Sequence, residues 1–150
     1  MVKSNAKTRR ELLVFRQFLR EAGLPYLEEM IENRPPPEPD ILYAHPDDGI
    51  IAFELVEICS EEIAELVTRA TNDALILASD PSRRMLRKKL LRKYGTKRPI
   101  ELICYTEGRV ITPDGVIIDT VKPILASQKK FRRIWLLGDR LHRLHPDEHI

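Results

Sequence analysis

Apolar and polar residues alternate along the chain in two patterns, one typical of helices and one typical of strands. Apolar spacings of three and four residues predict helices, whereas short and nearly continuous apolar runs predict strands that are buried on both faces. The stretches with helical spacing are residues 4–21, a short segment at 25–33, 60–79, 80–94 and, after a loop, 112–128 with an interruption near Pro123. The stretches with strand character are residues 40–44, 49–59, 99–108 and 131–139.

The loop between the first two predicted strands is HPDDG, residues 45–49, whose Pro, Asp and Gly are typical of a hairpin turn. The later strands are separated by predicted helices, which requires crossover connections. The economical arrangement is an α/β fold with a single mixed β-sheet of about four to five strands flanked by helices. We expect one domain, residues 1–150, in which residues 138–150 are a polar C-terminal tail.

Composition and the chain ends favour a cytoplasmic protein. No apolar run approaches the roughly 20 residues that a membrane helix needs, and the N-terminal MVKSNAKTRRELL lacks the apolar core of a signal peptide. Cys59 and Cys104 lie in apolar, strand-like settings and have no CxxC or Cys/His neighbours. We therefore expect reduced core cysteines and no membrane association.

The net charge is only +2, but the charges are segregated along the chain. Residues 21–65 contain thirteen acids and one base, whereas residues 82–98 contain nine bases and no acid. A further basic cluster, KKFRR, spans residues 129–133. The plainer interpretation of a charge run is a solvated helix face. The combination of an acidic and a basic block in one small domain also suits a metal site beside a polyanion.

The first predicted hairpin places two acids opposite each other. If Ala44 pairs with Ile50 across the turn, the same register pairs Asp40 with Glu54, with their Cβ atoms about 4.5–5.5 Å apart. Two carboxylates this close repel, so that one must take up a proton or a cation must lie between them. Oxygen ligands of this kind suit Mg²⁺ or Mn²⁺. A register shift of one residue would move Glu54 to the other face.

These residues resemble the PD-(D/E)XK nuclease superfamily, which has the restriction-endonuclease-like fold. Pro39 and Asp40 correspond to the PD pair, Glu54 corresponds to the first acid of (D/E)XK, and the order of elements is similar over roughly residues 4–137. The resemblance implies a metal-dependent nuclease that hydrolyses phosphodiester bonds of nucleic acid, DNA rather than RNA, with Asp40 and Glu54 as Mg²⁺ ligands. The alternative is a catalytically inactive nucleic-acid-binding or regulatory protein-interaction module on the same fold. A third option is an interaction protein without a nucleic-acid role.

The chain departs from the family pattern at Val56, which stands where the motif lysine is expected. Glu57 would join the site only through a strand bulge, and it is equally well explained as an acid beside a helix start. Lys89 or Lys93, which fall within the apolar stripe of the predicted helix 80–94, are candidates for the missing amine. The alternative is that their stems cover apolar surface while their ammonium groups reach water.

The basic helix is also the expected nucleic-acid contact, and a homodimer is an option by analogy with enzymes that cut both strands of a duplex. Asp47 and Asp48 are expected to serve the geometry of the turn, and Trp135 is expected to pack in the core. The residues expected to hold backbone phosphates are Arg83, Arg84, Arg87, Lys88 and Arg92.

Overall fold

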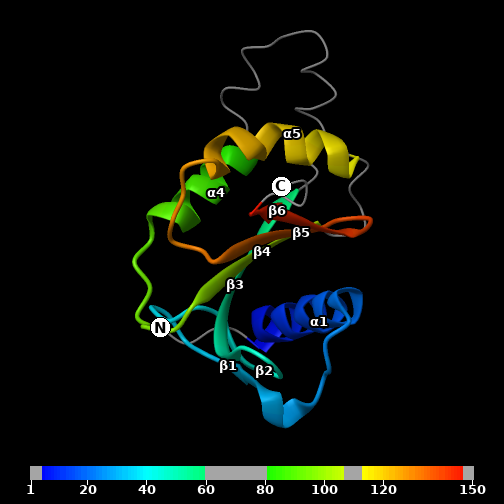
Figure 1. Ribbon diagram of the computed structural model, residues 1–150, viewed down its shortest axis with the longest axis vertical. Coiled ribbons are helices and arrows are strands. Elements are labelled where there is room, and N and C mark those ends of the chain that lie inside the picture. The colour runs from blue at the N-terminus through cyan, green and yellow to red at the C-terminus, as the bar shows by residue number, and fades with distance from the viewer. Residues whose placement is uncertain (1–4, 60–80, 107–112, 147–150) are drawn as a thin grey trace, which may run out of the picture.

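The computed structural model describes residues 5–59, 81–106 and 113–146. A six-stranded sheet carries helix α1 on one side and helices α4 and α5 on the other (Figure 1). The helices are α1 (Asn5–Ala22), α4 (Pro81–Leu91) and α5 (Asp114–Leu125), with a short 3-10 turn η1 (Glu28–Met30). The strands are β1 (Ile31–Asn33), β2 (Ile41–His45), β3 (Gly49–Cys59), β4 (Ile100–Thr106), β5 (Arg133–Leu137) and β6 (Leu141–His145).

The sheet is mixed, as the pattern of elements predicted. Its strands follow the order β1-β2-β3-β4-β5-β6. Strands β1, β2 and β3 form an antiparallel meander, β3, β4 and β5 are parallel, and β6 is antiparallel to β5. The prediction of an α/β fold with a single mixed sheet flanked by helices is therefore confirmed, whereas the predicted number of four to five strands is too low.

The two additional strands are those at the edges of the sheet. β1 follows η1 inside the segment 25–33, for which a short helix was expected, and β6 lies inside the segment assigned to the tail. Both strands are only partly buried, and β6 reads LHRLH, without an apolar run. Neither strand has a strong strand pattern in its sequence. Each forms because it pairs its backbone hydrogen bonds with a neighbour that is already part of the sheet.

Each face of the sheet has its own apolar core. One core joins Phe15, Phe18 and Leu19 of α1 to side chains of β2, β3 and β4. The other joins the opposite faces of the strands to α4 and α5, with Leu86 and Val121 fully buried. β3 contributes to both cores, which explains why its sequence is apolar at nearly every position.

The register of the first hairpin is the predicted one. Ala44 lies opposite Ile50, and Gly49 closes the turn with a positive φ of 77°, a conformation that favours glycine. The alternation of side chains then sends Ala52 and Glu54 of β3 toward α4 and α5, and Ala52 belongs to the core on that side. The turn and the apolar pattern together fix which carboxylates meet.

Helix boundaries follow local signals with one exception. α1 is followed by Gly23, whose φ is 71°, and the amide of Leu24 donates to the carbonyl of Leu19, which completes a C-terminal capping motif. α5 continues to Leu125, two residues beyond Pro123, where an interruption was expected. The helix predicted over residues 60–79 lies outside the described residues. Across the part of the chain that is described, no helix is long and apolar enough to cross a membrane.

Candidate functional site

The carboxylates of Asp40 and Glu54 meet in a buried position at the open end of the β2–β3 hairpin. Asp40 immediately precedes β2, and its backbone amide donates to Glu54 Oε1 at 3.2 Å. The Leu55 amide in turn donates to Asp40 Oδ2 at 2.9 Å. Asp40 is 8% exposed and Glu54 only 2%. These reciprocal hydrogen bonds hold the two side chains against the hairpin backbone.

Two cations from the α4 segment reach the same carboxylate oxygen. Lys89 Nζ lies 3.2 Å from Glu54 Oε2, and Arg92 Nη1 lies 3.5 Å from it. The half-buried Tyr94 donates its hydroxyl to the backbone carbonyl of Lys89 at 3.2 Å, and its ring packs edge-on against Phe131. The turn that follows α4 therefore positions Lys89 and closes the apolar side of the site.

The site retains a proton in the neutral range. Burial and, to a smaller extent, the adjacent Asp40 raise the pKa of Glu54 to about 7, whereas Lys89 opposes the rise. Burial, together with the charge of Glu54, also raises the pKa of Tyr94, which stays a neutral phenol. The Asp40–Glu54 pair is therefore balanced between a singly protonated and a fully ionised state at physiological pH.

The structure brings together three of the five residues expected to be catalytic, Asp40, Glu54 and Lys89. Glu57 is not among them, because its carboxylate lies 3.5 Å from the guanidinium of Arg10 on α1, on the other side of the sheet. A bulge does occur near the end of β3, but it follows Glu57 and leaves this side chain on the α1 side.

Lys93, the alternative amine, is exposed, and among the described residues it forms no ion pair with Asp40 or Glu54. Val56, where the motif lysine was expected, is buried in the core that faces α4 and α5. The amine that accompanies Glu54 thus comes from a helix rather than from the strand.

Of the residues expected to hold phosphates, Arg87, Lys88 and Arg92 are exposed. Arg92 also contacts the buried carboxylate of Glu54. The side chains of Arg83 and Arg84 lie outside the described part of the structure. A signal for Arg92 was present in the sequence, because it follows Lys89 by three residues and a helix places such positions on one side.

Asp40 and Glu54 are also the residues expected to bind a metal ion. Among the residues that the structure describes, no three His, Cys, Asp or Glu side chains gather so that they could hold a metal ion. The pair supplies two carboxylates, which is the number of protein ligands that Mg²⁺ often accepts, with water in its other positions. Lys89 and Arg92 already contact Glu54 Oε2, so a divalent cation bound by both carboxylates would have to displace them from that oxygen.

Comparisons with known proteins give little guidance to this site. No family model matches the chain, and no curated protein matches it. A similar solved structure is that of a protein of unknown function from Pseudomonas aeruginosa strain PAO1, described as belonging to the monooxygenase superfamily. The two are 17% identical, the match covers 96% of this chain and 75% of the other, and the TM-score is 0.47.

This comparison contradicts the nuclease assignment drawn from the sequence, because the matched protein is described as a monooxygenase-superfamily member and not as a nuclease. The predicted membership of the PD-(D/E)XK superfamily, with its restriction-endonuclease-like fold and metal-dependent nuclease activity, is therefore wrong. The alternative of an inactive module on that fold is not supported either. The physical reason is that a Pro-Asp pair followed by an acid is a short pattern, and a buried carboxylate pair does not by itself specify phosphodiester chemistry. A TM-score of 0.47 at 17% identity does not show that this chain is a monooxygenase-superfamily member either.

Proposed function

We propose that the site couples the uptake of a proton to the binding of an anionic group. Glu54 takes up the proton, and Lys89 and Arg92, released from its charge, bind the anion. The observation that supports this function is that both cations contact one oxygen, Oε2, of a carboxyl whose pKa is about 7. Protonation of this single carboxyl changes the charge balance of the whole site.

Charge balance gives the coupling its direction. With Glu54 ionised, its charge and that of Asp40 match those of Lys89 and Arg92. With Glu54 protonated, one positive charge is in excess, and a small anion can neutralise it. The side chains of Lys89 and Arg92 are 18% and 42% exposed, whereas that of Glu54 is 2% exposed. A ligand therefore reaches the cations from solvent.

Calorimetric titration with sulfate tests the coupling, because sulfate keeps its charge throughout the neutral range. We expect its affinity to fall as the pH rises through about 7, and binding near pH 7 to take up a fraction of a proton, measured in two buffers with different heats of ionisation. Glu54→Gln should bind sulfate without proton uptake. Lys89→Met should weaken binding, whereas the matched control Lys93→Met should not. Binding without proton uptake, or equal affinities in the two lysine variants, would contradict the proposal.

A divalent cation at the same pair is a second proposal, supported by the convergence of two buried carboxylates. Asp40 and Glu54 would hold Mg²⁺ or Mn²⁺, and binding would displace the shared proton. Mn²⁺ binding, measured by electron paramagnetic resonance, should therefore be accompanied by release of a proton below pH 7. The Asp40→Asn variant should not bind Mn²⁺. The control Asp47→Asn removes an exposed acid and should bind Mn²⁺ as the wild type does.

The nucleic-acid partner expected from the sequence also stays a proposal, supported by exposed bases on and after α4, including Arg87, Lys88 and Lys97. Fluorescence anisotropy with a short DNA duplex should show binding that weakens steeply with salt and weakens further in an Arg87→Gln, Lys88→Gln variant. Unchanged binding in this variant would exclude α4 as the contact. A homodimer and a cytoplasmic location stay predictions.

A further inference from the structure

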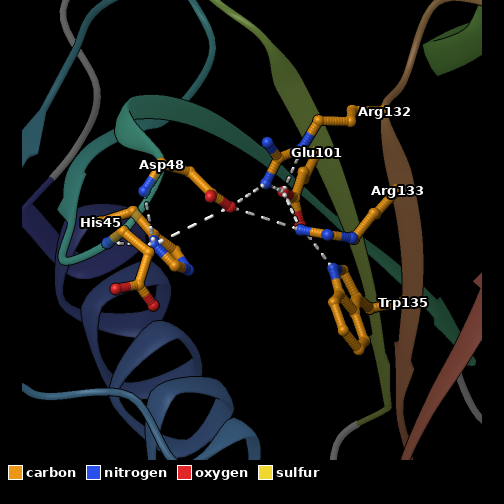
Figure 2. A network of polar contacts seen from close by, with 7 residues as sticks. His45, Asp48, Glu101, Arg132, Arg133 and Trp135 are labelled. Carbon is orange, nitrogen blue, oxygen red and sulfur yellow. Dashed lines mark hydrogen bonds and ion pairs between the residues drawn. The ribbon is translucent and has the colours of Figure 1, made fainter.

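Another buried carboxylate, Glu101 of β4, lies on the α1 side of the sheet and accepts hydrogen bonds from three side chains (Figure 2). It is 2% exposed. The indole Nε1 of Trp135 donates to its Oε1 at 2.8 Å. Arg132 donates to its Oε2 from Nε at 3.0 Å and from Nη2 at 2.7 Å, and Arg133 donates from Nη1 at 3.4 Å. The two guanidinium groups are thus held side by side on one carboxylate oxygen.

The outer side of this arginine pair is covered by a residue of the β2–β3 turn (Figure 2). Asp48 Oδ2 accepts from Arg132 Nη2 at 2.9 Å and lies 3.9 Å from Arg133 Nη1. The hydrogen bond from Arg132 lowers the pKa of Asp48, so that it contacts the arginines as a carboxylate. Glu101 and Asp48 together balance the two guanidinium charges, but only Asp48 lies at the surface.

We propose that Arg132 and Arg133 form a binding site for an oxyanion, a carboxylate or phosphate group of a ligand, and that Asp48 occupies this site in the structure. Guanidinium groups bind carboxylates and phosphates through charge-assisted N–H···O hydrogen bonds, and here two of them lie on one oxygen of Glu101. Glu101 positions the pair from the buried side, where its own side chain is 3% exposed. The arginine side chains are 32% and 34% exposed and can be reached from solvent.

The contact with Asp48 is of the kind that a ligand can displace. Asp48 lies at the tip of a hairpin turn, and its carboxylate meets the arginines in a solvent-exposed setting, where ion pairs are weak. The turn does not depend on this carboxylate for its own shape, because the amides of Asp47 and Asp48 both donate to the ring nitrogen Nδ1 of His45, at 3.1 and 3.2 Å. The side chain can therefore leave while the turn keeps its conformation.

Trp135 provides a local readout of this site. It is the only tryptophan in the chain, and its indole shares Glu101 with both arginines. The test titrates the full chain with inorganic phosphate near pH 8 at constant ionic strength and follows tryptophan fluorescence. At this pH Glu54 is ionised, so the Lys89 site is neutralised by its own carboxylate. Lys89→Met should leave the response of Trp135 unchanged, which separates the two sites.

We expect Asp48→Asn to bind phosphate about two- to fivefold more tightly than the wild type, because the competing carboxylate is lost. Asp47→Asn makes the same change in net charge one residue away and should bind as the wild type does. Adding Arg133→Gln to Asp48→Asn should abolish the gain; Arg133 is the safer choice because its contact with Glu101 is the longer one. Equal affinities in the two Asp→Asn variants, or a gain that survives Arg133→Gln, would overturn the proposal.

Discussion

Replacing Glu54 by glutamine should make the protein more stable at neutral and alkaline pH. Glutamine has almost the same shape as glutamate and can accept the same hydrogen bond from the Asp40 amide, but it has no charge to bury. Lys89 would lose its charged partner, although its side chain is 18% exposed and can turn to water. The substitution therefore removes the titration of Glu54 with little change in packing.

The size of the effect follows from the pKa of Glu54, which rises from 4.5 to about 7 on folding. Between these values the unfolded chain has lost the proton and the folded protein still holds it, so the stability of the wild type falls as the pH rises. Each pKa unit corresponds to about 1.36 kcal/mol, which gives a loss of roughly 3 kcal/mol, complete above pH 7. The glutamine variant has no such loss.

Urea unfolding of both proteins at a series of pH values between about 4.5 and 8 measures this difference. The free energy of unfolding of the variant, relative to that of the wild type, should rise by roughly 3 kcal/mol across the range. Titratable groups that do not contact Glu54 are common to both proteins and cancel in the difference. Glu29→Gln, at an exposed position, is the control and should track the wild type. A difference between Glu54→Gln and the wild type that stays constant with pH would refute the assignment of a buried, proton-retaining carboxyl.

Two further predictions concern the scaffold that carries the site. Leu86→Ala should destabilise the protein by about 2–5 kcal/mol because Leu86 is fully buried between α4 and the sheet. The control Leu91→Ala, on the same helix, changes a side chain that is 81% exposed and should alter stability by less than about 0.5 kcal/mol. Equal losses of stability in urea unfolding would contradict this placement of α4. Gly23→Ala should cost about 1 kcal/mol because the φ of 71° is unfavourable for alanine, and with nothing within 4 Å of the added Cβ no steric clash contributes; an unchanged melting temperature would show that α1 does not end in this conformation.

The central hairpin is the part of the molecule that the sequence predicted best. Its turn residues and its apolar alternation specify a register, and a register of period two decides which side chains share a face. For this reason the meeting of Asp40 and Glu54 could be predicted before any coordinates. The apolar stripe of the basic helix likewise identified Lys89 as a partner for these acids, together with Lys93, and could not choose between them.

The edge strands β1 and β6, and the polar network around Glu101, could not be predicted from local sequence patterns. β6 has a mixed sequence and takes its hydrogen bonds from β5. Glu101, Arg132 and Asp48 are far apart in the chain, and only the order of strands brings them together. A signal for Glu101 did exist, since a lone acid within the apolar run IELICY requires a buried partner, but the identity of that partner depends on which strand lies beside β4.

The sequence by itself determined the class of the fold, the pairing of β2 with β3 and the convergence of two carboxylates, because each of these depends on periodicity and on contacts between neighbouring elements. The tertiary structure decided that Lys89, and not Lys93, reaches Glu54, and it placed Glu57 against α1. It also brought Asp48 next to Arg132 and Arg133 at the start of β5. It also determined that Glu54 is buried deeply enough to keep a proton near pH 7. Burial and long-range pairing result from how the layers pack, and no local pattern encodes the desolvation that moves a pKa.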